Sequence, residues 1–274
     1  MIIFSNCKIN IGLNVVNKRN DGFHNLETIF YPLPLFDVLE LIDADKTELT
    51  LLGLPVPGDV ANNIVLKAYQ LLKKEFPRLP SVHFYLLKNI PIGAGLGAGS
   101  ANGTNALLAL NKKYQLQLNK DQLSQFALQL GSDCPFFIEN QPVTASGRGE
   151  QMQPIRLELS NYELILVNPG IPISTPWAFQ QIQPQLPAAS LKELIALPIT
   201  EWKNLIKNDF EKPVFKAHPE IARIKEQLYA NGALFSLMSG SGSTIFGLFD
   251  KNSNPRLSFP DNYFVKTISL SEQE

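Results

Sequence analysis

The sequence predicts an α+β protein with two domains, residues 1–155 and 156–274. Short segments rich in β-formers alternate with stretches whose apolar residues recur at the helical period. This pattern starts again after about residue 155. The sequence has no internal repeat or low-complexity tract that would indicate a different architecture. A chain of 274 residues is long enough for one large domain or two of moderate size.

The first half contains predicted strands followed by helices. The strands are short and bounded by turn residues: Ile9–Val16, Val38–Ile42, Glu48–Leu52 and Val82–Leu87. A helix is predicted over Ile64–Phe76, because its apolar residues fall on one face. Two more helices follow, one from about Ser100 and one over Gln122–Leu130. Asp121 is the predicted N-cap of the latter helix, and Gly131 ends it.

The second half begins with an apolar strand over Leu164–Val167. Ser174 then caps a short helix, with Pro176 in the first turn, where proline is tolerated. Three further helices are predicted: Leu191–Leu197, Glu201–Lys207 and Pro219–Ala230. Three strands complete this half: Leu234–Met238, Thr244–Phe249 and Tyr263–Ile268. The first two strands flank a turn of serine and glycine, residues 239–243.

Charge excludes some classes of partner. The chain has 24 Lys+Arg and 25 Asp+Glu, a net charge of 24 − 25 = −1, and a pI of about 6.3. Proteins that bind nucleic acids or acidic membranes usually carry clustered basic residues. We therefore expect neither a nucleic acid nor a membrane as partner.

Two further observations bear on the compartment. No apolar stretch reaches the ~18 residues of a membrane span, and polar residues interrupt the N-terminal segment before a signal-peptide core can form. Cys7 and Cys134 are too few and too far apart to form a disulfide scaffold or a metal cluster, and are predicted to be buried thiols. These features predict a cytoplasmic protein.

Glycine is unevenly distributed, because five of the 17 glycines fall within residues 93–103. The segment Pro91–Ser100 lies between a predicted strand and a predicted helix. Backbone N–H groups at such a helix N-terminus can converge on an anion, and glycine leaves no Cβ in the way of a phosphate. The segment is therefore predicted to bind phosphate.

Other interpretations of this segment are weaker. A Walker loop needs a lysine, and none lies between Asn89 and Asn111. Gly93, Gly95 and Ala98 formally meet the spacing of a dinucleotide-binding loop. Such a loop also needs an acidic residue about 20 positions further on, and the first candidate, Asp121, is already the predicted N-cap of a helix. A merely flexible turn is disfavoured by the entropic cost of so many glycines.

The glycine-rich segment resembles the central motif of the GHMP kinases, and further family motifs occur in the right order. The segments that carry this resemblance are Cys7–Leu13, Arg19–Thr28, Pro91–Ser100, Gly131–Phe137 and Leu237–Phe246. The segment Asp21-Gly22-Phe23-His24 narrows the resemblance to one group of GHMP kinases. These enzymes phosphorylate diphosphocytidyl-methylerythritol in the non-mevalonate route to isoprenoid precursors. The resemblance implies a two-domain fold in which ATP and the acceptor meet in the interdomain cleft. The γ-phosphoryl group would pass to a tertiary hydroxyl of the acceptor.

The resemblance also implies the catalytic residues. Asp133 would accept or orient the proton of the acceptor hydroxyl, and Lys8 would keep Asp133 ionised and neutralise charge near the acceptor oxygen. Taken alone, Asp133 is equally well explained as a turn aspartate before a proline. Lys8 lies on the strand face opposite Ile9 and Ile11, and alternation does not say whether that face is solvent or cleft.

ATP is the implied cofactor, with Mg²⁺. The residues expected to bind ATP are Pro91, Ile92, Gly93, Ala94, Gly95, Leu96, Gly97, Ala98, Gly99, Ser100, Ala101 and Asn63. Ser100 would cap its helix and offer a hydroxyl to a Mg²⁺-bound phosphate oxygen. Asn63 matches a residue near the adenine in the family, although it could equally be a helix cap.

The implied acceptor is a cytidine diphosphate sugar alcohol. The residues expected to bind it are Asn10, Phe23, His24, Thr175, Phe179, Ser239, Gly240 and Ser241. Phe23 and Phe179 could stack on either side of the cytosine, although a single phenylalanine is more often a core residue. The turn containing Ser239 could equally be an ordinary hairpin.

Some residues depart from the family pattern. Ala101 stands where a second small hydroxyl is frequent, residues 102–104 differ from the usual run, and Phe23 replaces a typical tyrosine. Alternatives to the implied function are a GHMP kinase for another small alcohol, a nicotinamide-dependent oxidoreductase and a non-catalytic nucleotide-binding module. We expect a monomer or a weak homodimer.

Overall fold

The computed structural model describes residues 1–270. The chain divides into two compact units, each built from separate segments. The first unit contains residues 1–7, 35–92 and 97–141, and the second contains residues 8–34, 93–96 and 142 onward. Both units therefore include residues that precede position 155.

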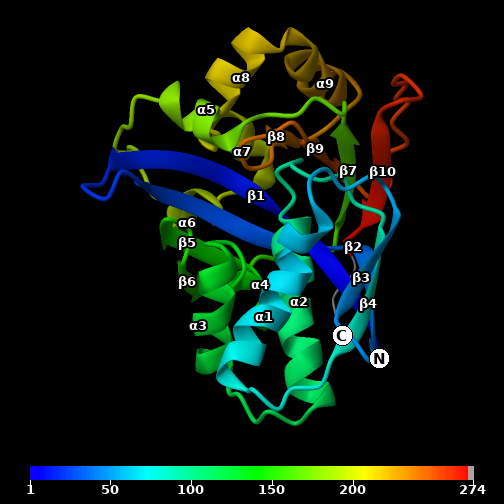
Figure 1. Ribbon diagram of the computed structural model, residues 1–274. Helices are drawn as coiled ribbons and strands as arrows, with labels where there is room; N and C mark the ends of the chain where they lie inside the picture. Colours follow the sequence, from blue (N-terminus) through cyan, green and yellow to red (C-terminus); the bar gives the residue numbers. More distant parts are fainter. Residues whose placement is uncertain (271–274) are drawn as a thin grey trace. The chain divides into compact units, whose positions relative to one another are not determined.

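In the first unit, strands pack against helices. Its strands are β3 (Glu48–Gly53), β4 (Val82–Lys88), the second half of β2 (His24–Asp43) and residues 2–7 of β1 (Ile2–Lys18). β3 runs parallel to β4, and β4 pairs antiparallel with residues 38–43 of β2. The helices are η1 (Val60–Asn62), α1 (Ile64–Glu75), α2 (Ala98–Lys113), α3 (Lys120–Leu130) and α4 (Phe136–Glu139). Figure 1 shows α1, α2 and α3 beside one another.

Strand alternation builds the core of this unit. Leu39 and Leu41 of β2, and Phe84 and Leu86 of β4, are buried on one face of the strands. This face packs against the apolar sides of α1, α2 and α3. Helical periodicity and strand alternation thus direct the same set of side chains into one core, as the sequence patterns require.

The second unit contains two sets of strands. Residues 8–18 of β1 belong to this unit, and β1 pairs with β2. Residues 26–30 of β2 pair with β5 (Val143–Gly147), which pairs in turn with β6 (Gln151–Pro154). A separate antiparallel sheet has the order β10-β7-β9-β8. Its strands are β7 (Tyr162–Asn168), β8 (Phe235–Met238), β9 (Ile245–Asp250) and β10 (Phe264–Ser269).

Five helices accompany this sheet: α5 (Thr175–Gln180), α6 (Leu191–Leu194), α7 (Ile199–Leu205), α8 (Glu211–Ala217) and α9 (Pro219–Ala230). Ile221, Ile224 and Leu228 lie on one face of α9 and join the core of this unit. Among residues 1–270, none of the helices has both the length and the apolar character needed to cross a bilayer.

Several predicted elements have different bounds. The first two strands are much longer than predicted. The prediction was too short because buried polar residues such as Asn6, Lys8 and Asn10 interrupt the apolar alternation by which a strand is recognised. Five short elements, η1, α4, α8, β5 and β6, were not predicted. Short segments carry too few periodic positions to be recognised.

Two predicted helix starts were wrong. Asn119, not Asp121, caps α3, because Asn119 and Gln122 form a reciprocal capping box. Asp121 instead lies in the first turn, where an acidic side chain suits the helix dipole. α2 begins at Ala98 with Gly97 as its N-cap, so Ser100 is inside the helix and does not cap it.

The cysteine prediction is confirmed, since Cys7 and Cys134 are both buried and unbridged. Burial raises the pKa of the Cys134 thiol to about 11. This cysteine is therefore a neutral side chain of the core at physiological pH.

Phe84 tests the core of the first unit. Phe84→Ala should lower the free energy of unfolding by about 3–5 kcal/mol, because the fully buried ring leaves a cavity. Phe4→Ala is the control, since Phe4 is 65% exposed and its loss should cost much less. Urea unfolding followed by circular dichroism measures both, and equal losses would contradict the described packing.

Candidate active site

Lys8 and Asn10 are buried side chains of β1. Their exposed fractions are 3% and 2%. The Lys8 ammonium donates a hydrogen bond to Asn10 Oδ1 and lies 4.5 Å from the centroid of the Phe30 ring. Lys8 is therefore a buried cation rather than a surface lysine, which strand alternation alone left open.

The Asn10 side chain is held on both sides. Its Oδ1 faces Lys8, and its Nδ2 donates to Thr28 Oγ1 at 2.8 Å. The Thr28 hydroxyl in turn donates to the Gly12 carbonyl at 2.6 Å. This chain fixes the direction of the amide and so places an oxygen beside the Lys8 ammonium.

Ser239 joins three predicted motifs within the second unit. Its hydroxyl donates to the Gly95 carbonyl at 2.7 Å and accepts from the Asn10 backbone N–H at 3.1 Å. The Thr244 N–H also donates to the Ala94 carbonyl at 3.3 Å. The serine turn thus holds residues of β1 and of the glycine-rich segment.

The glycine-rich segment has the backbone that its composition predicts. Gly93, Gly95 and Gly97 have φ angles of +64°, +77° and +65°. A Cβ on Gly95 would lie 2.0 Å from the Ser239 carbonyl oxygen. Gly97 caps α2 without a side-chain hydrogen bond, so the first N–H groups of this helix can face an anion.

Asp133 lies in the turn between α3 and α4, in the first unit. Its side chain is half-buried, and its carbonyl accepts from the Phe136 N–H at 3.3 Å. Thr104 Oγ1 donates to the Cys134 carbonyl at 2.8 Å and so ties this turn to α2. Ser100 lies in the first turn of α2.

Asn63 is the N-cap of α1, because its side chain accepts from the Val65 N–H at 3.0 Å. The helix-cap interpretation is therefore confirmed. An additional contact with adenine stays a prediction.

The predicted acceptor residues lie in the second unit. The His24 and Phe179 rings are stacked, with centroids 4.9 Å apart and planes 13° apart. Burial and the nearby Lys18 lower the pKa of His24, so its imidazole is neutral at pH 7. Phe23 is 53% exposed, and the Arg148 guanidinium lies 4.7 Å from its ring centroid. Stacking of Phe23 and Phe179 on a base stays a prediction.

The turn between β8 and β9 is a hairpin turn whose residues also form hydrogen bonds with Thr175 and Asn208. Thr175 Oγ1 and Ser241 Oγ are 2.9 Å apart. Asn208 Nδ2 donates to the Met238 and Gly240 carbonyls at 2.7 and 2.8 Å. Asn208 was not predicted, because no motif surrounds it and its partners are distant in the sequence.

Comparison with known proteins identifies the family. The family models for the GHMP kinases N terminal domain and the GHMP kinases C terminal match residues 63–141 and 190–257. A 4-diphosphocytidyl-2-C-methyl-D-erythritol kinase of Parabacteroides distasonis is 50% identical over 251 residues, 92% of each chain. The chain belongs to this family of GHMP kinases. A kinase of the same name from Bacteroides fragilis is 51% identical, over 91% of this chain and 92% of its own.

Solved structures agree with this GHMP kinase fold. A crystal structure of 4-(cytidine 5'-diphospho)-2C-methyl-D-erythritol kinase matches with a TM-score of 0.77 and 28% identity, covering 98% of this chain and 99% of that one. Homoserine kinase from Cytophaga hutchinsonii matches with a TM-score of 0.68 at 16% identity, covering 98% and 96%. The latter likeness shows the shared fold alone.

The predicted site residues of this GHMP kinase are divided between the two units. In the second unit, Lys8, Asn10, Gly95 and Ser239 form one connected cluster. The first unit carries Asp133, together with Ser100 and Asn63. Within residues 1–270, no three His, Cys, Asp or Glu side chains are grouped so that they could hold a metal ion.

Gly95 tests the contact between the glycine-rich segment and the serine turn. Gly95→Ala should destabilise the protein by several kcal/mol, since its Cβ would meet the Ser239 backbone in addition to the ~1–2 kcal/mol cost of positive φ. Gly93→Ala is the matched control, because its φ is also positive but its Cβ would have no neighbour within 4 Å. Chemical denaturation should separate the two variants, and equal midpoints would show that the contact is unimportant.

Proposed function

We propose that this protein transfers the γ-phosphoryl group of ATP to the tertiary hydroxyl of 4-diphosphocytidyl-2-C-methyl-D-erythritol in non-mevalonate isoprenoid biosynthesis. One observation carries the proposal: the buried Lys8–Asn10 pair is hydrogen-bonded through Ser239 to the glycine-rich segment. This connects a cation suited to a reacting oxygen with a segment suited to phosphate. Relatives that are 41–51% identical and bear the name of this kinase support the same conclusion.

Phosphoryl transfer requires positioning and charge neutralisation more than covalent chemistry. Asp133 accepts the proton of the acceptor hydroxyl as the new bond to phosphorus forms. Lys8 neutralises negative charge that develops at the acceptor oxygen, and Asn10 holds the ammonium in place. Because Lys8 is 3% exposed, water screens its charge little.

The glycine-rich segment binds the phosphates of ATP. The N-terminus of α2 offers backbone N–H groups and the positive end of a helix dipole. Residues 91–101 thereby hold anionic oxygens without a lysine of their own. This explains how a protein with a net charge of −1 binds two phosphate-bearing substrates.

Mg²⁺ accompanies ATP in this proposal. The cation prefers oxygen ligands and usually keeps several waters, with one or two protein ligands besides the phosphates. The hydroxyl of Ser100, in the first turn of α2, is an oxygen donor of the right kind. Mg²⁺ would supply further neutralisation of phosphate charge.

The acceptor is held by its cytosine and its phosphates. The stacked His24 and Phe179 offer a flat aromatic surface, and the neutral imidazole can hydrogen-bond the base edge. Gly240 and Ser241 offer N–H and hydroxyl groups to the phosphates. The Ser239 hydroxyl and N–H are bonded within the unit, so Ser239 supports this turn instead. We also propose a cytoplasmic enzyme that is a monomer or a weak homodimer.

Asp133 provides the most direct test of this mechanism. Asp133→Asn should reduce kcat by about 10²–10⁴-fold in a coupled ADP-release assay, because the amide cannot accept the proton. Asp121→Asn, an exposed aspartate in the same unit, is the control and should keep the parent rate. An Asp133→Asn variant as fast as the parent would refute the proposed role.

The same assay tests the acceptor. Diphosphocytidyl-methylerythritol should stimulate ATP turnover, whereas homoserine and mevalonate should not. Turnover with either of the other alcohols and none with the cytidyl substrate would establish a different GHMP kinase activity.

A further inference from the structure

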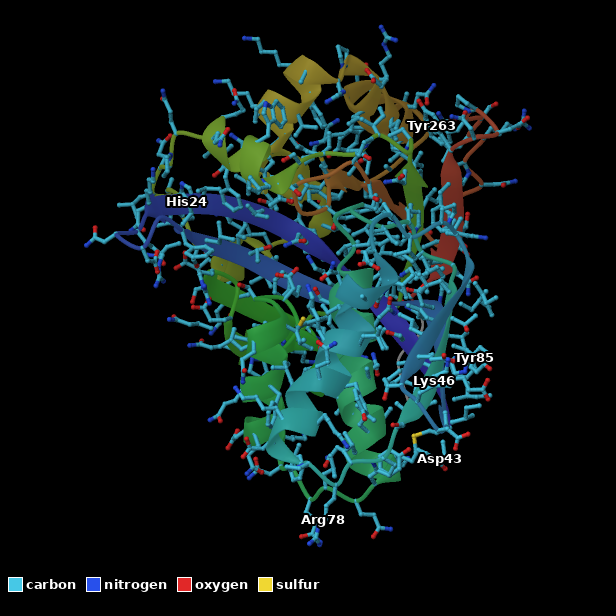
Figure 2. All side chains as sticks on the ribbon, viewed as in Figure 1. His24, Asp43, Lys46, Arg78, Tyr85 and Tyr263 are labelled. Carbon is cyan, nitrogen blue, oxygen red and sulfur yellow. The ribbon has the colours of Figure 1, made fainter. Side chains whose placement is uncertain are left out.

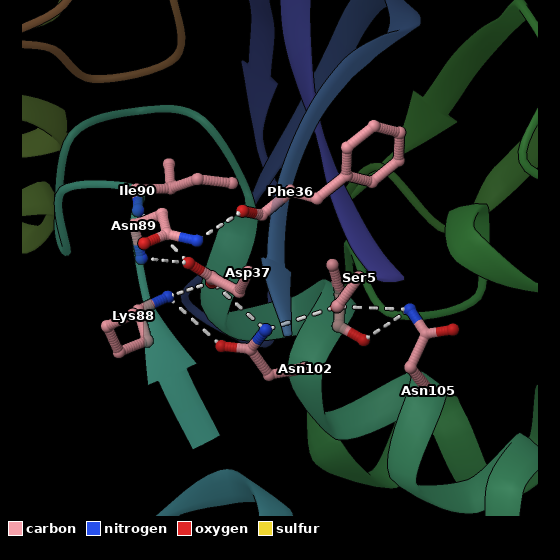
Figure 3. Close-up of polar contacts among 9 residues, drawn as sticks. Ser5, Phe36, Asp37, Lys88, Asn89, Ile90, Asn102 and Asn105 are labelled. Carbon is pink, nitrogen blue, oxygen red and sulfur yellow. Dashed lines mark hydrogen bonds and ion pairs between the residues drawn. The ribbon is translucent and has the colours of Figure 1, made fainter. Parts of the chain in front are cut away.

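A buried charged cluster in the first unit has no part in the mechanism above. Asp37 and Lys88 form an ion pair, with exposed fractions of 0% and 2%. Figure 3 shows this pair surrounded by polar groups of β1, β2, β4 and α2. The remaining members of the cluster are Ser5, Asn89, Ile90, Asn102 and Asn105.

Both charged residues continue the core faces of their strands. Asp37 points to the same side of β2 as the buried Leu39, and Lys88 to the same side of β4 as the buried Leu86. The pairing of Val38 with Leu87 brings Asp37 opposite Lys88 at the end of β4. The core face therefore ends in an ion pair at the point where the chain leaves β4 towards the glycine-rich segment.

One carboxylate holds the chain on both sides of that segment. Asp37 Oδ1 accepts from the backbone N–H groups of Asn89 and Ile90 at 2.8 and 3.0 Å. Asp37 Oδ2 accepts from Lys88 Nζ and, at 3.1 Å, from Asn102 Nδ2. Asn89 and Ile90 directly precede Pro91, and Asn102 lies in α2 directly after Ala101.

Asn102 is fixed by further contacts. Its Oδ1 accepts from Lys88 Nζ at 3.1 Å, and its Nδ2 also donates to Ser5 Oγ at 3.1 Å. Asn105, one turn further along α2, donates to the same serine hydroxyl at 3.1 Å. The start of α2 is thus attached to β1, β2 and β4 at once.

Stability alone does not explain this arrangement. Removing two charges from water costs several kcal/mol per ion, and well-packed apolar residues are often as stabilising as a buried ion pair. Burial accordingly lowers the pKa of Lys88, although the carboxylate opposes this shift. Apolar side chains, however, could not accept hydrogen bonds from the two N–H groups before the segment or from the amide after it.

We propose that Asp37, Lys88 and Asn102 are positioning residues that fix both ends of residues 91–101 and so set the affinity for ATP. This inference rests on the proposed function, because it assumes that the segment binds ATP. The three side chains act through the backbone of the segment and need not touch the nucleotide.

The test is a double substitution, Asp37→Leu/Lys88→Met, measured by calorimetric titration with ATP in the presence of Mg²⁺. It removes both charges and the acceptor oxygens together, because loss of the carboxylate alone would leave a buried, unpaired ammonium. We expect the Kd for ATP to rise at least tenfold while the KM for the acceptor stays within twofold. A purely structural role would reduce the folded fraction and leave both constants of the folded molecules unchanged.

The matched control is Asp43→Leu/Lys113→Met. Asp43 ends β2 and Lys113 ends α2, so this ion pair links the same strand and helix as Asp37 and Asn102. Asp43, which Figure 2 labels, has a side chain that is 68% exposed. The control removes the same two kinds of charge and should leave the Kd for ATP unchanged.

Asn102→Ala is the second variant and keeps the ion pair intact. It removes the link between Asp37 and α2, so the Kd for ATP should again rise at least tenfold, even if the double variant does not fold. An unchanged Kd in folded Asn102→Ala or in the folded double variant would overturn the inference. A parent protein that binds no ATP would instead overturn the proposed function itself, and this inference with it.

Discussion

The hydroxyl of Ser239 makes the hydrogen bonds on which the candidate active site depends. It donates to the Gly95 carbonyl and accepts from the Asn10 N–H, using both capacities of a hydroxyl within a buried setting. Close approach is possible only because residue 95 is glycine, as a Cβ there would meet the Ser239 backbone. This one side chain therefore connects three parts of the second unit: the strand that carries Lys8, the glycine-rich segment and the β8–β9 turn.

Buried polar groups organise both units in the same way. In the second unit, Thr28 and Asn10 orient the Lys8 ammonium, and in the first unit Asp37 gathers donors from either side of the glycine-rich segment. A buried polar side chain that lacks a hydrogen-bond partner destabilises the fold, so few other conformations of these side chains are tolerated. Hydrogen bonds thereby hold these polar side chains in place, while Leu, Ile and Phe cores supply most of the stability.

The sequence predicted the parts whose signal is local. The glycine-rich segment has the positive φ angles that its glycines permit, and the periodic pattern of residues 219–230 predicted α9 with its observed bounds. The lengths of β1 and β2 could not be predicted, because their buried polar residues look like loop residues in a pattern of apolar alternation. The partners of Ser239 and Asp37 could not be predicted either. They lie from 51 to 229 positions away, and hydrogen bonds at that separation leave no periodic trace.

Amide hydrogen exchange at Asn10 tests the central claim most directly, because this N–H is bonded to the Ser239 hydroxyl. Ser239→Ala should speed exchange at Asn10 roughly tenfold, which corresponds to about 1.4 kcal/mol for one lost hydrogen bond. Ser236→Ala is the control: Ser236 is also fully buried, and its hydroxyl has no hydrogen-bond partner among residues 1–270. Exchange at Asn10 that is equally slow in both variants would contradict the account of Ser239 as the residue that holds these motifs together.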